Sequence, residues 1–190
     1  MATPAGPAIP TVAIFASERG PGDPERANLM SQAGTLLARR GARLVCLAEY
    51  EGIPIPLVTA ARAAGGDVLI VADDSFVAPR SLADVPCERL PGPEARLFRV
   101  ASLANLFVGL PGSLASARSL YQAWAKAGGG SGGKPVVLLN RNRAFEGVRG
   151  LYADVFSHSV KKPDRYVQFT DSVEDLWNKV SWLLGEAPQR

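Results

Sequence analysis

The sequence has a single histidine, His158, and two cysteines, Cys46 and Cys87, in 190 residues. A single histidine excludes a metal cluster built on histidines, and a serine–histidine triad could only use His158. We interpret His158 as an exposed residue at a helix end. The two cysteines form no recognisable disulfide framework, and Cys46, inside an apolar run, is predicted to be a small core residue. We therefore expect no bound metal or cofactor and a cytoplasmic location.

Long apolar runs and strong charge are also missing. No apolar run reaches the roughly 20 residues that cross a bilayer, so no membrane contact is expected. The net charge is +3, the isoelectric point is about 9.1, and no basic run is long enough for a nucleic-acid partner. Residues 1–10 are rich in alanine and proline and lack the charged start and apolar centre of a signal peptide, so we expect a short disordered lead-in.

What the sequence does contain is typical of one soluble globular domain, expected over residues 11–186. Hydrophobic residues make up 47% and charged residues 21%, and the length allows a substantial core. A glycine-rich segment at 128–133 is interpreted as a flexible loop, because the same pattern of elements resumes after it.

Short apolar runs alternate with longer segments of helical periodicity. Strands are predicted at 12–16, 44–48, 68–72, 106–110, 136–139 and 166–169. Helices are predicted at 24–40, 56–64, 94–104, 113–127 and 143–157, with a last helix after Asp171 or Ser172, while 73–92 is predicted to be irregular with room for one short strand. The fold class is therefore α/β: a three-layer, doubly wound, Rossmann-like domain with a mostly parallel sheet, which binds ligands at the carboxyl ends of its strands.

The segment from Pro111 to Ser116 is the most informative part of the chain. It follows the apolar run 106–110 and opens a predicted helix, so its backbone N–H groups are available to an anion. Ser113 and Ser116 are the predicted donors to a phosphate. The alternative is that these hydroxyl groups only cap the helix.

This segment resembles a degenerate copy of the signature Pro-Gly-Gly-x-Gly-Thr-x-x-Glu of the LOG family, Rossmann-like proteins long labelled lysine decarboxylases that include the cytokinin riboside 5′-monophosphate phosphoribohydrolases. Pro111 and Gly112 match, and Ser119 stands at the glutamate position. The family's Ala-x-x-Ala-Gly-Gly matches at 61–66 and its Lys-Pro-Val-x-Leu-Leu-Asn at 134–140. Its Gly-Gly-Gly-containing segment falls on 44–55, where Gly52 is kept and the triple glycine is not.

The resemblance implies which residues would form a site. The family's arginine, which with the glutamate is held to cleave an N-glycosidic bond, falls on Arg96, the expected catalytic residue. Ser119 cannot carry the negative charge that stabilises a cationic sugar, and Glu49 or Glu51 is an alternative carboxylate. The expected ligand-binding residues are Ser17, Gly52, Pro111, Gly112, Ser113 and Ser116.

The sequence thus predicts a divergent LOG-like protein that binds a nucleotide or another phosphate-bearing small molecule without the ancestral hydrolysis. One alternative is an active nucleoside 5′-monophosphate phosphoribohydrolase with a rearranged carboxylate. Another is a carrier of a phosphate-bearing cofactor such as the molybdenum cofactor. A homodimer is expected, with the helices that carry Arg96, Phe98 and Val100 and Leu120, Tyr121 and Trp124 at its interface.

Overall fold

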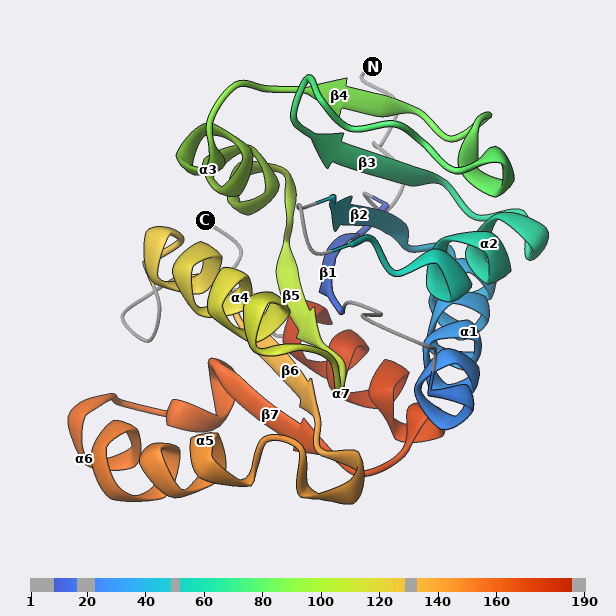
Figure 1. Ribbon diagram of the computed structural model, residues 1–190. Helices are drawn as coiled ribbons and strands as arrows, with labels where there is room; N and C mark the ends of the chain where they lie inside the picture. The colour runs from blue at the N-terminus through green and yellow to red at the C-terminus, as the bar shows by residue number, and fades with distance from the viewer. Residues whose placement is uncertain (1–8, 17–22, 49–51, 129–132, 186–190) are drawn as a thin grey trace, which may run out of the picture.

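The computed structural model describes residues 9–16, 23–48, 52–128 and 133–185, shown as a ribbon in Figure 1. Most of the expected lead-in at 1–10 and of the glycine-rich loop lies outside the described residues. In the described part, a seven-stranded sheet has the order β4-β3-β2-β1-β5-β6-β7, and every neighbouring pair is parallel. Its strands are β1 (Thr11–Phe15), β2 (Arg43–Leu47), β3 (Val68–Ala72), β4 (Cys87–Arg89), β5 (Leu106–Gly109), β6 (Val136–Leu139) and β7 (Val167–Thr170).

Helices cover both faces of the sheet, which makes the three predicted layers (Figure 1). One face is covered by α1 (Pro24–Arg39), α2 (Ile55–Ala63) and α7 (Val173–Gly185). The other face is covered by α3 (Pro93–Leu103) and α4 (Leu114–Lys126), with α5 (Glu146–Leu151) beside them. The predicted doubly wound, Rossmann-like α/β fold is confirmed, and the sheet is parallel throughout.

Strand β1 shows why these apolar runs fold this way. Val12 and Ile14 pack into the core on the α1 side, whereas Ala13 and Phe15 pack into the core on the α3 side. All four are buried, because a strand in the middle of a parallel sheet has no face in water. The predicted continuous apolar runs are thus the signature of a sheet covered on both sides.

The order of the strands reverses between β1 and β5. From β1 the chain continues outward through β2, β3 and β4, and it then returns to the other side of β1 to form β5, β6 and β7. In open α/β sheets a crevice for ligands forms at this switch point, at the carboxyl ends of the strands. Here the segment that follows β5 begins with Leu110 and Pro111.

The predicted helix at 143–157 is the part of the fold that differs most from expectation. A 3₁₀ turn at Arg141–Arg143, helix α5, a π-helical turn at Tyr152–Phe156 and a short α6 (Ser157–Ser159) stand in its place. Leu151, an apolar residue within the predicted helix, is 62% exposed. Gly147 and Gly150 lie within α5 and lower its helix propensity, and beyond Leu151 the chain continues as a π-helical turn.

The cysteines behave as their positions predict. Cys46 is buried in β2, and burial raises the pKa of its thiol to about 12, so it is an inert core residue. Cys87 is exposed on the edge strand β4.

Among the described residues no helix is long and apolar enough to cross a membrane. The same residues contain no group of three or more histidine, cysteine, aspartate or glutamate side chains placed to hold a metal ion.

Candidate functional site at the sheet's switch point

Helix α4 begins at the switch point, and both serines near its start serve its N-terminus. Ser113 is the N-cap, and its Oγ accepts a hydrogen bond from the Ser116 N–H over 3.2 Å. The Ser116 hydroxyl is buried and donates to the Ser113 carbonyl over 2.9 Å. The capping interpretation therefore accounts for these bonds of both hydroxyl groups, and a direct role for them in binding a phosphate stays a prediction.

A polar pocket of about 220 Å³ lies beside Pro111, between the start of α1 and the segment after β6. Its volume is below the roughly 300 Å³ at which pockets for drug-sized ligands begin, so it suits a phosphate group or another small polar fragment. The lining residues combine two guanidinium groups, two carboxylates and a small apolar wall: Asp23, Glu25, Arg26, Leu29, Pro111, Arg141, Asn142 and Ala144.

The charged groups of this pocket are only loosely paired. Arg26 Nε lies 3.4 Å from Asp23 Oδ2, and Arg141 Nε lies 4.0 Å from Glu25 Oε1. All four side chains are about half exposed or more, so these pairs contribute little to stability. Arg26 Nη1 also donates to the Gly112 carbonyl over 3.4 Å, which ties α1 to the loop after β5. The two guanidinium groups are therefore available to a stronger anionic partner.

The segment after β6 has an unusual backbone. Asn142 and Arg143 both have positive φ, 53° and 60°, a left-handed conformation that residues with a Cβ adopt at a cost. The buried Asn140 side chain holds this turn: its Oδ1 accepts from the Phe145 N–H over 2.7 Å, and its Nδ2 donates to Glu146 Oε2 over 3.0 Å. Backbone strain that buried contacts keep in place is common at ligand sites, and here it places Asn142 and Arg141 at the pocket.

Ser119 lies on the face of α4 that packs against the sheet and is 1% exposed. It carries no charge and is covered by protein. The structure therefore offers no carboxylate at the position of the family's glutamate. Ser17, Glu49 and Glu51 lie outside the described residues, so their expected roles remain predictions.

Gly52 directly follows the undescribed residues 49–51, in the connection between β2 and α2. Its φ is 123°, which only glycine adopts readily. Gly52 thus keeps the backbone freedom that the resemblance leads one to expect, and a ligand contact there remains a prediction.

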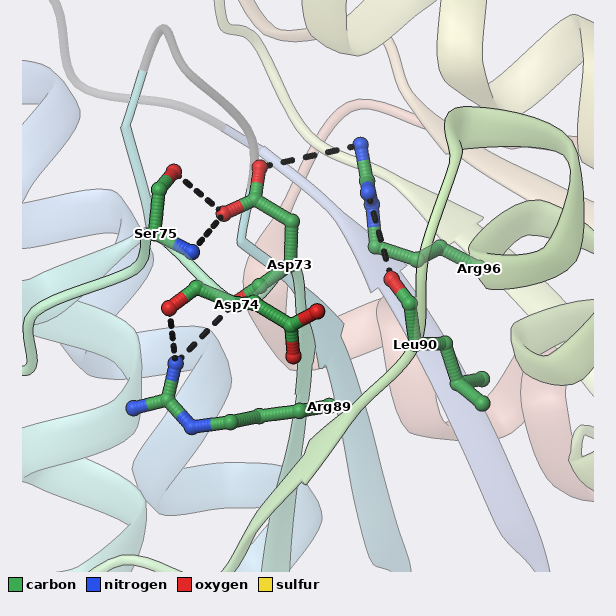
Figure 2. Close-up of polar contacts among 6 residues, drawn as sticks. All are labelled: Asp73, Asp74, Ser75, Arg89, Leu90 and Arg96. Carbon is green, nitrogen blue, oxygen red and sulfur yellow. Dashed lines mark hydrogen bonds and ion pairs between the residues drawn. The ribbon is translucent and has the colours of Figure 1, made fainter.

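Arg96, the expected catalytic residue, is held at the carboxyl end of β3 (Figure 2). Its Nη2 lies 3.9 Å from Asp73 Oδ2, and its Nη1 donates to the Leu90 carbonyl over 3.4 Å. The Arg96 side chain is 11% exposed, and its buried Nε has no hydrogen-bond partner among the described residues. The described contacts of Arg96 lead to β3 and β4, and none of them reaches the start of α4.

Asp73 is a carboxylate that the sequence interpretation missed. Its Oδ1 accepts from the Ser75 hydroxyl over 2.6 Å and from the Ser75 N–H over 2.9 Å, as Figure 2 shows. The hydrogen bond from the Ser75 side chain, assisted by the nearby charge of Arg96, holds the pKa of Asp73 below its usual value. Asp73 is therefore ionised at neutral pH and faces the only expected catalytic residue that the structure describes.

The neighbouring Arg89 fixes the backbone of the same turn, since its Nη1 donates to the carbonyls of Asp73 and Asp74 over 3.0 and 3.2 Å (Figure 2). The sequence could have indicated Asp73 as a site residue, because Asp73 directly follows the apolar run 68–72, where a strand of a parallel sheet ends. Arg141 carries the same signal after β6.

The fold and this site define a class: a doubly wound α/β protein with a small polar pocket at the switch point of its sheet. No family model matches the sequence. It is 29% identical over 148 residues to the cytokinin riboside 5′-monophosphate phosphoribohydrolase of Mycobacterium marinum, which covers 76% of this chain and 78% of the relative. The protein of the same name from Mycobacterium tuberculosis is 28% identical over 142 residues, covering 73% of this chain and 75% of the relative.

Among solved structures, the molybdenum cofactor (Moco) carrier protein of Chlamydomonas reinhardtii superposes with a TM-score of 0.69 at 18% identity, over 94% of this chain and 99% of the other. At that identity the likeness concerns the fold alone. The two mycobacterial relatives confirm the resemblance to the LOG family that was predicted from the sequence, and the solved structure agrees with it in fold.

Proposed function

We propose that this chain binds a nucleotide or another small phosphate-bearing ligand at the switch point, without the phosphoribohydrolase activity for which its relatives are named. The observation that carries the proposal is the pocket between Pro111 and the start of α1, where the guanidinium groups of Arg26 and Arg141 are only loosely paired. A phosphate can replace a carboxylate as the partner of a guanidinium and accept two parallel hydrogen bonds from it. Glu25 can then accept hydrogen bonds from the hydroxyl groups of an attached sugar.

The position of Ser119 supports the proposed absence of hydrolysis. Cleavage of an N-glycosidic bond passes through a cationic sugar, which a nearby carboxylate stabilises. Ser119 is neutral and buried against the sheet, so it cannot supply that charge. In this proposal the ion pair of Arg96 with Asp73 is structural and takes no part in hydrolysis.

A second candidate is the active hydrolase with a rearranged carboxylate, and one observation favours it. Asp73 is ionised and lies 3.9 Å from Arg96, which places an arginine and a carboxylate together at the carboxyl edge of the sheet. In this candidate Asp73 stabilises the cationic sugar and Arg96 binds the phosphate. Release of free base from a nucleoside monophosphate would select it over the first proposal.

A thermal-shift titration tests the binding proposal, because a ligand that binds only the native state raises the melting temperature. The probes are AMP, inorganic phosphate and a pterin phosphate, the last to represent the cofactor-carrier candidate suggested by the name of the Chlamydomonas neighbour. We expect AMP or the pterin phosphate to stabilise the wild-type protein, and we expect Arg141→Gln to remove the effect.

The matched control is Arg118→Gln, because Arg118 is an exposed arginine of α4 that lines none of the described pockets. It should leave the stabilisation unchanged. If neither phosphate ester stabilises the protein, or if Arg118→Gln weakens the effect as much as Arg141→Gln, the proposal is wrong.

We also propose that the protein forms a homodimer through the outer side of α3 and the start of α4. Phe98 is 66% exposed on α3, and the exposed Leu114 begins α4. Val100 and Leu120, expected at this interface, are buried in the core beneath these helices, so the exposed apolar side chains carry the proposal in their place. If these exposed side chains lie on one surface, pairing about a two-fold axis would bury them, and two-fold pairing is the commonest arrangement of homo-oligomers.

A further inference from the structure

A second pocket, of about 510 Å³, lies at the opposite edge of the sheet from β4, between helix α7 and the segment that leads into the edge strand β7. It shares no lining residue with the pocket at the switch point. Its volume falls within the range of small-molecule sites. The lining is polar and carries one aromatic ring: Asp164, Gln168, Asp175, Asn178, Lys179 and Trp182.

Helix α7 supplies four of these residues from one face. Asp175, Asn178, Lys179 and Trp182 follow one another at spacings of three, one and three residues, which places them side by side on a helix. The opposite face of α7 is buried in the core. Trp182 is 40% exposed, so its indole is available at the pocket and does not act as a core anchor.

The two carboxylates of the pocket are held in place by neighbouring side chains. Asp164 Oδ1 accepts a hydrogen bond from the Tyr152 hydroxyl over 2.7 Å, and Gln168 Nε2 donates to the Asp164 carbonyl over 2.6 Å. Burial, together with this bond to Asp164, raises the pKa of Tyr152, so the phenol stays a donor at neutral pH.

On the other side of the pocket, Asp175 Oδ2 accepts from Thr170 Oγ1 over 3.3 Å, and its Oδ1 accepts from Asn178 Nδ2 over 3.2 Å. Each carboxylate thus approaches the pocket from a fixed position, while both keep lone pairs for a ligand.

We infer that this pocket binds a small organic cation that carries an alkylated ammonium group. Two carboxylates attract a positive charge, and the exposed indole of Trp182 offers an aromatic face to it. Alkyl substituents on the nitrogen favour the aromatic face, because such a cation is weakly hydrated and forms few hydrogen bonds. Lys179 is the one cationic side chain in the lining, so it opposes the ligand by like-charge repulsion.

Calorimetric titration of the full chain with choline tests this inference, followed in parallel by tryptophan fluorescence. The control ligand is 3,3-dimethylbutan-1-ol, which has the shape of choline without its charge. We expect choline to bind and the neutral alcohol not to bind. Trp182→Leu and the double variant Asp164→Asn/Asp175→Asn should each weaken choline binding about tenfold or more.

Lys179→Ala gives a prediction in the opposite direction: it should tighten choline binding, because it removes the repelling charge. The matched control is Asp84→Asn, an exposed aspartate that lines none of the described pockets and should change nothing. All the substituted side chains lie at the surface, and circular dichroism verifies that the variants fold. Equal binding of choline and the neutral alcohol, no binding of choline up to about 10 mM, or weaker binding by Lys179→Ala would overturn the inference.

Discussion

The guanidinium of Arg96 on α3 and the carboxylate of Asp73 after β3 face each other over 3.9 Å, although they are 23 positions apart in the sequence. The resemblance to the LOG family predicted the position of the arginine, and the structure supplies a partner that the resemblance did not predict. The Arg96 side chain is 11% exposed, and a guanidinium that is buried to this extent needs a charged or polar partner. Whether Arg96 and Asp73 act together in catalysis therefore distinguishes the two candidate functions, the binding protein and the hydrolase with a rearranged carboxylate.

The first prediction concerns catalysis. With AMP as substrate, the purified protein should release free adenine about three orders of magnitude more slowly than an enzyme with the carboxylate in place, because Ser119 cannot stabilise the cationic sugar. Chromatography of the reaction mixture measures the free base. Rapid release that disappears in Asp73→Asn as well as in Arg96→Ala would contradict this prediction and establish Asp73 as the rearranged carboxylate.

The second prediction concerns the pH dependence of stability at Asp73. The hydrogen bond from the Ser75 hydroxyl lowers the folded-state pKa of Asp73, so the ionised form stabilises the fold above the ordinary aspartate pKa. This stabilisation is lost as the pH falls through the lowered value. Asp73→Asn should therefore be less stable than wild type at pH 7, and the difference should shrink as the pH falls below about 4.

Urea denaturation at several pH values measures this difference. Asp74→Asn is the matched control, because the exposed Asp74 lies next to Asp73 and its carboxylate makes none of these bonds. A difference between wild type and Asp73→Asn that stays the same from pH 7 to pH 3 would show that the carboxylate is not selectively stabilised in the folded protein.

The third prediction concerns the turn after β6. Asn140→Ala removes a buried hydrogen bond to the Phe145 N–H and a partly buried one to Glu146, and should lower the free energy of unfolding by about 1–3 kcal/mol. The strained turn at Asn142 and Arg143 then loses its support, so amide hydrogen exchange at 141–145 should become faster. Asn28→Ala, at an exposed position of α1, serves as the control. Unchanged exchange at 141–145 would mean that Asn140 does not hold the turn.

The fourth prediction concerns the contact between α1 and α2. Gly34 lies where a Cβ would collide with the backbone carbonyl of Leu57, so Gly34→Ala forces the two helices apart. We expect a loss of about 1–3 kcal/mol or more in chemical denaturation. Gly150→Ala is the contrasting variant: its Cβ meets nothing within 4 Å, and alanine should be neutral or stabilising by up to about 1 kcal/mol in α5. Equal effects of the two substitutions on the free energy of unfolding would contradict the prediction that Gly34 is needed for the close contact between α1 and α2.

The fifth prediction concerns assembly. Phe98→Glu should convert a dimer to a monomer, because it places a charge at the large apolar side chain that α3 exposes at the proposed interface. Light scattering at a protein concentration of roughly tens of micromolar measures the molar mass of the assembly. Phe98 is 66% exposed, so the substitution should leave the melting temperature of the protomer close to its original value. A wild-type monomer at that concentration would remove the basis for the proposed dimer.

Most of the fold could be predicted from the sequence because its signals are local. Pro24 begins α1, and Gly41, with a φ of 79°, follows its end, as expected from the preference of proline for the first turn of a helix and of glycine for a left-handed position after it. The irregular segment 73–92 was predicted to have room for one short strand and contains β4. Among the described residues, 143–157 differs most from its prediction, and it contains two glycines, which have a low helix propensity.

The sequence by itself determined the order of strands and helices, the buried apolar runs and the resemblance to the LOG motif in which Ser119 falls on the glutamate position, because periodicity and motif spacing are properties of neighbouring residues. Only the tertiary structure decided what meets at the carboxyl edge of the sheet. The pairing of Arg96 with Asp73, and of Asn142 with Glu25 over 3.1 Å, depends on how β3 and β6 lie relative to α3 and α1. These distances are fixed by the packing of helices on the sheet, to which every core residue contributes and which no local pattern encodes.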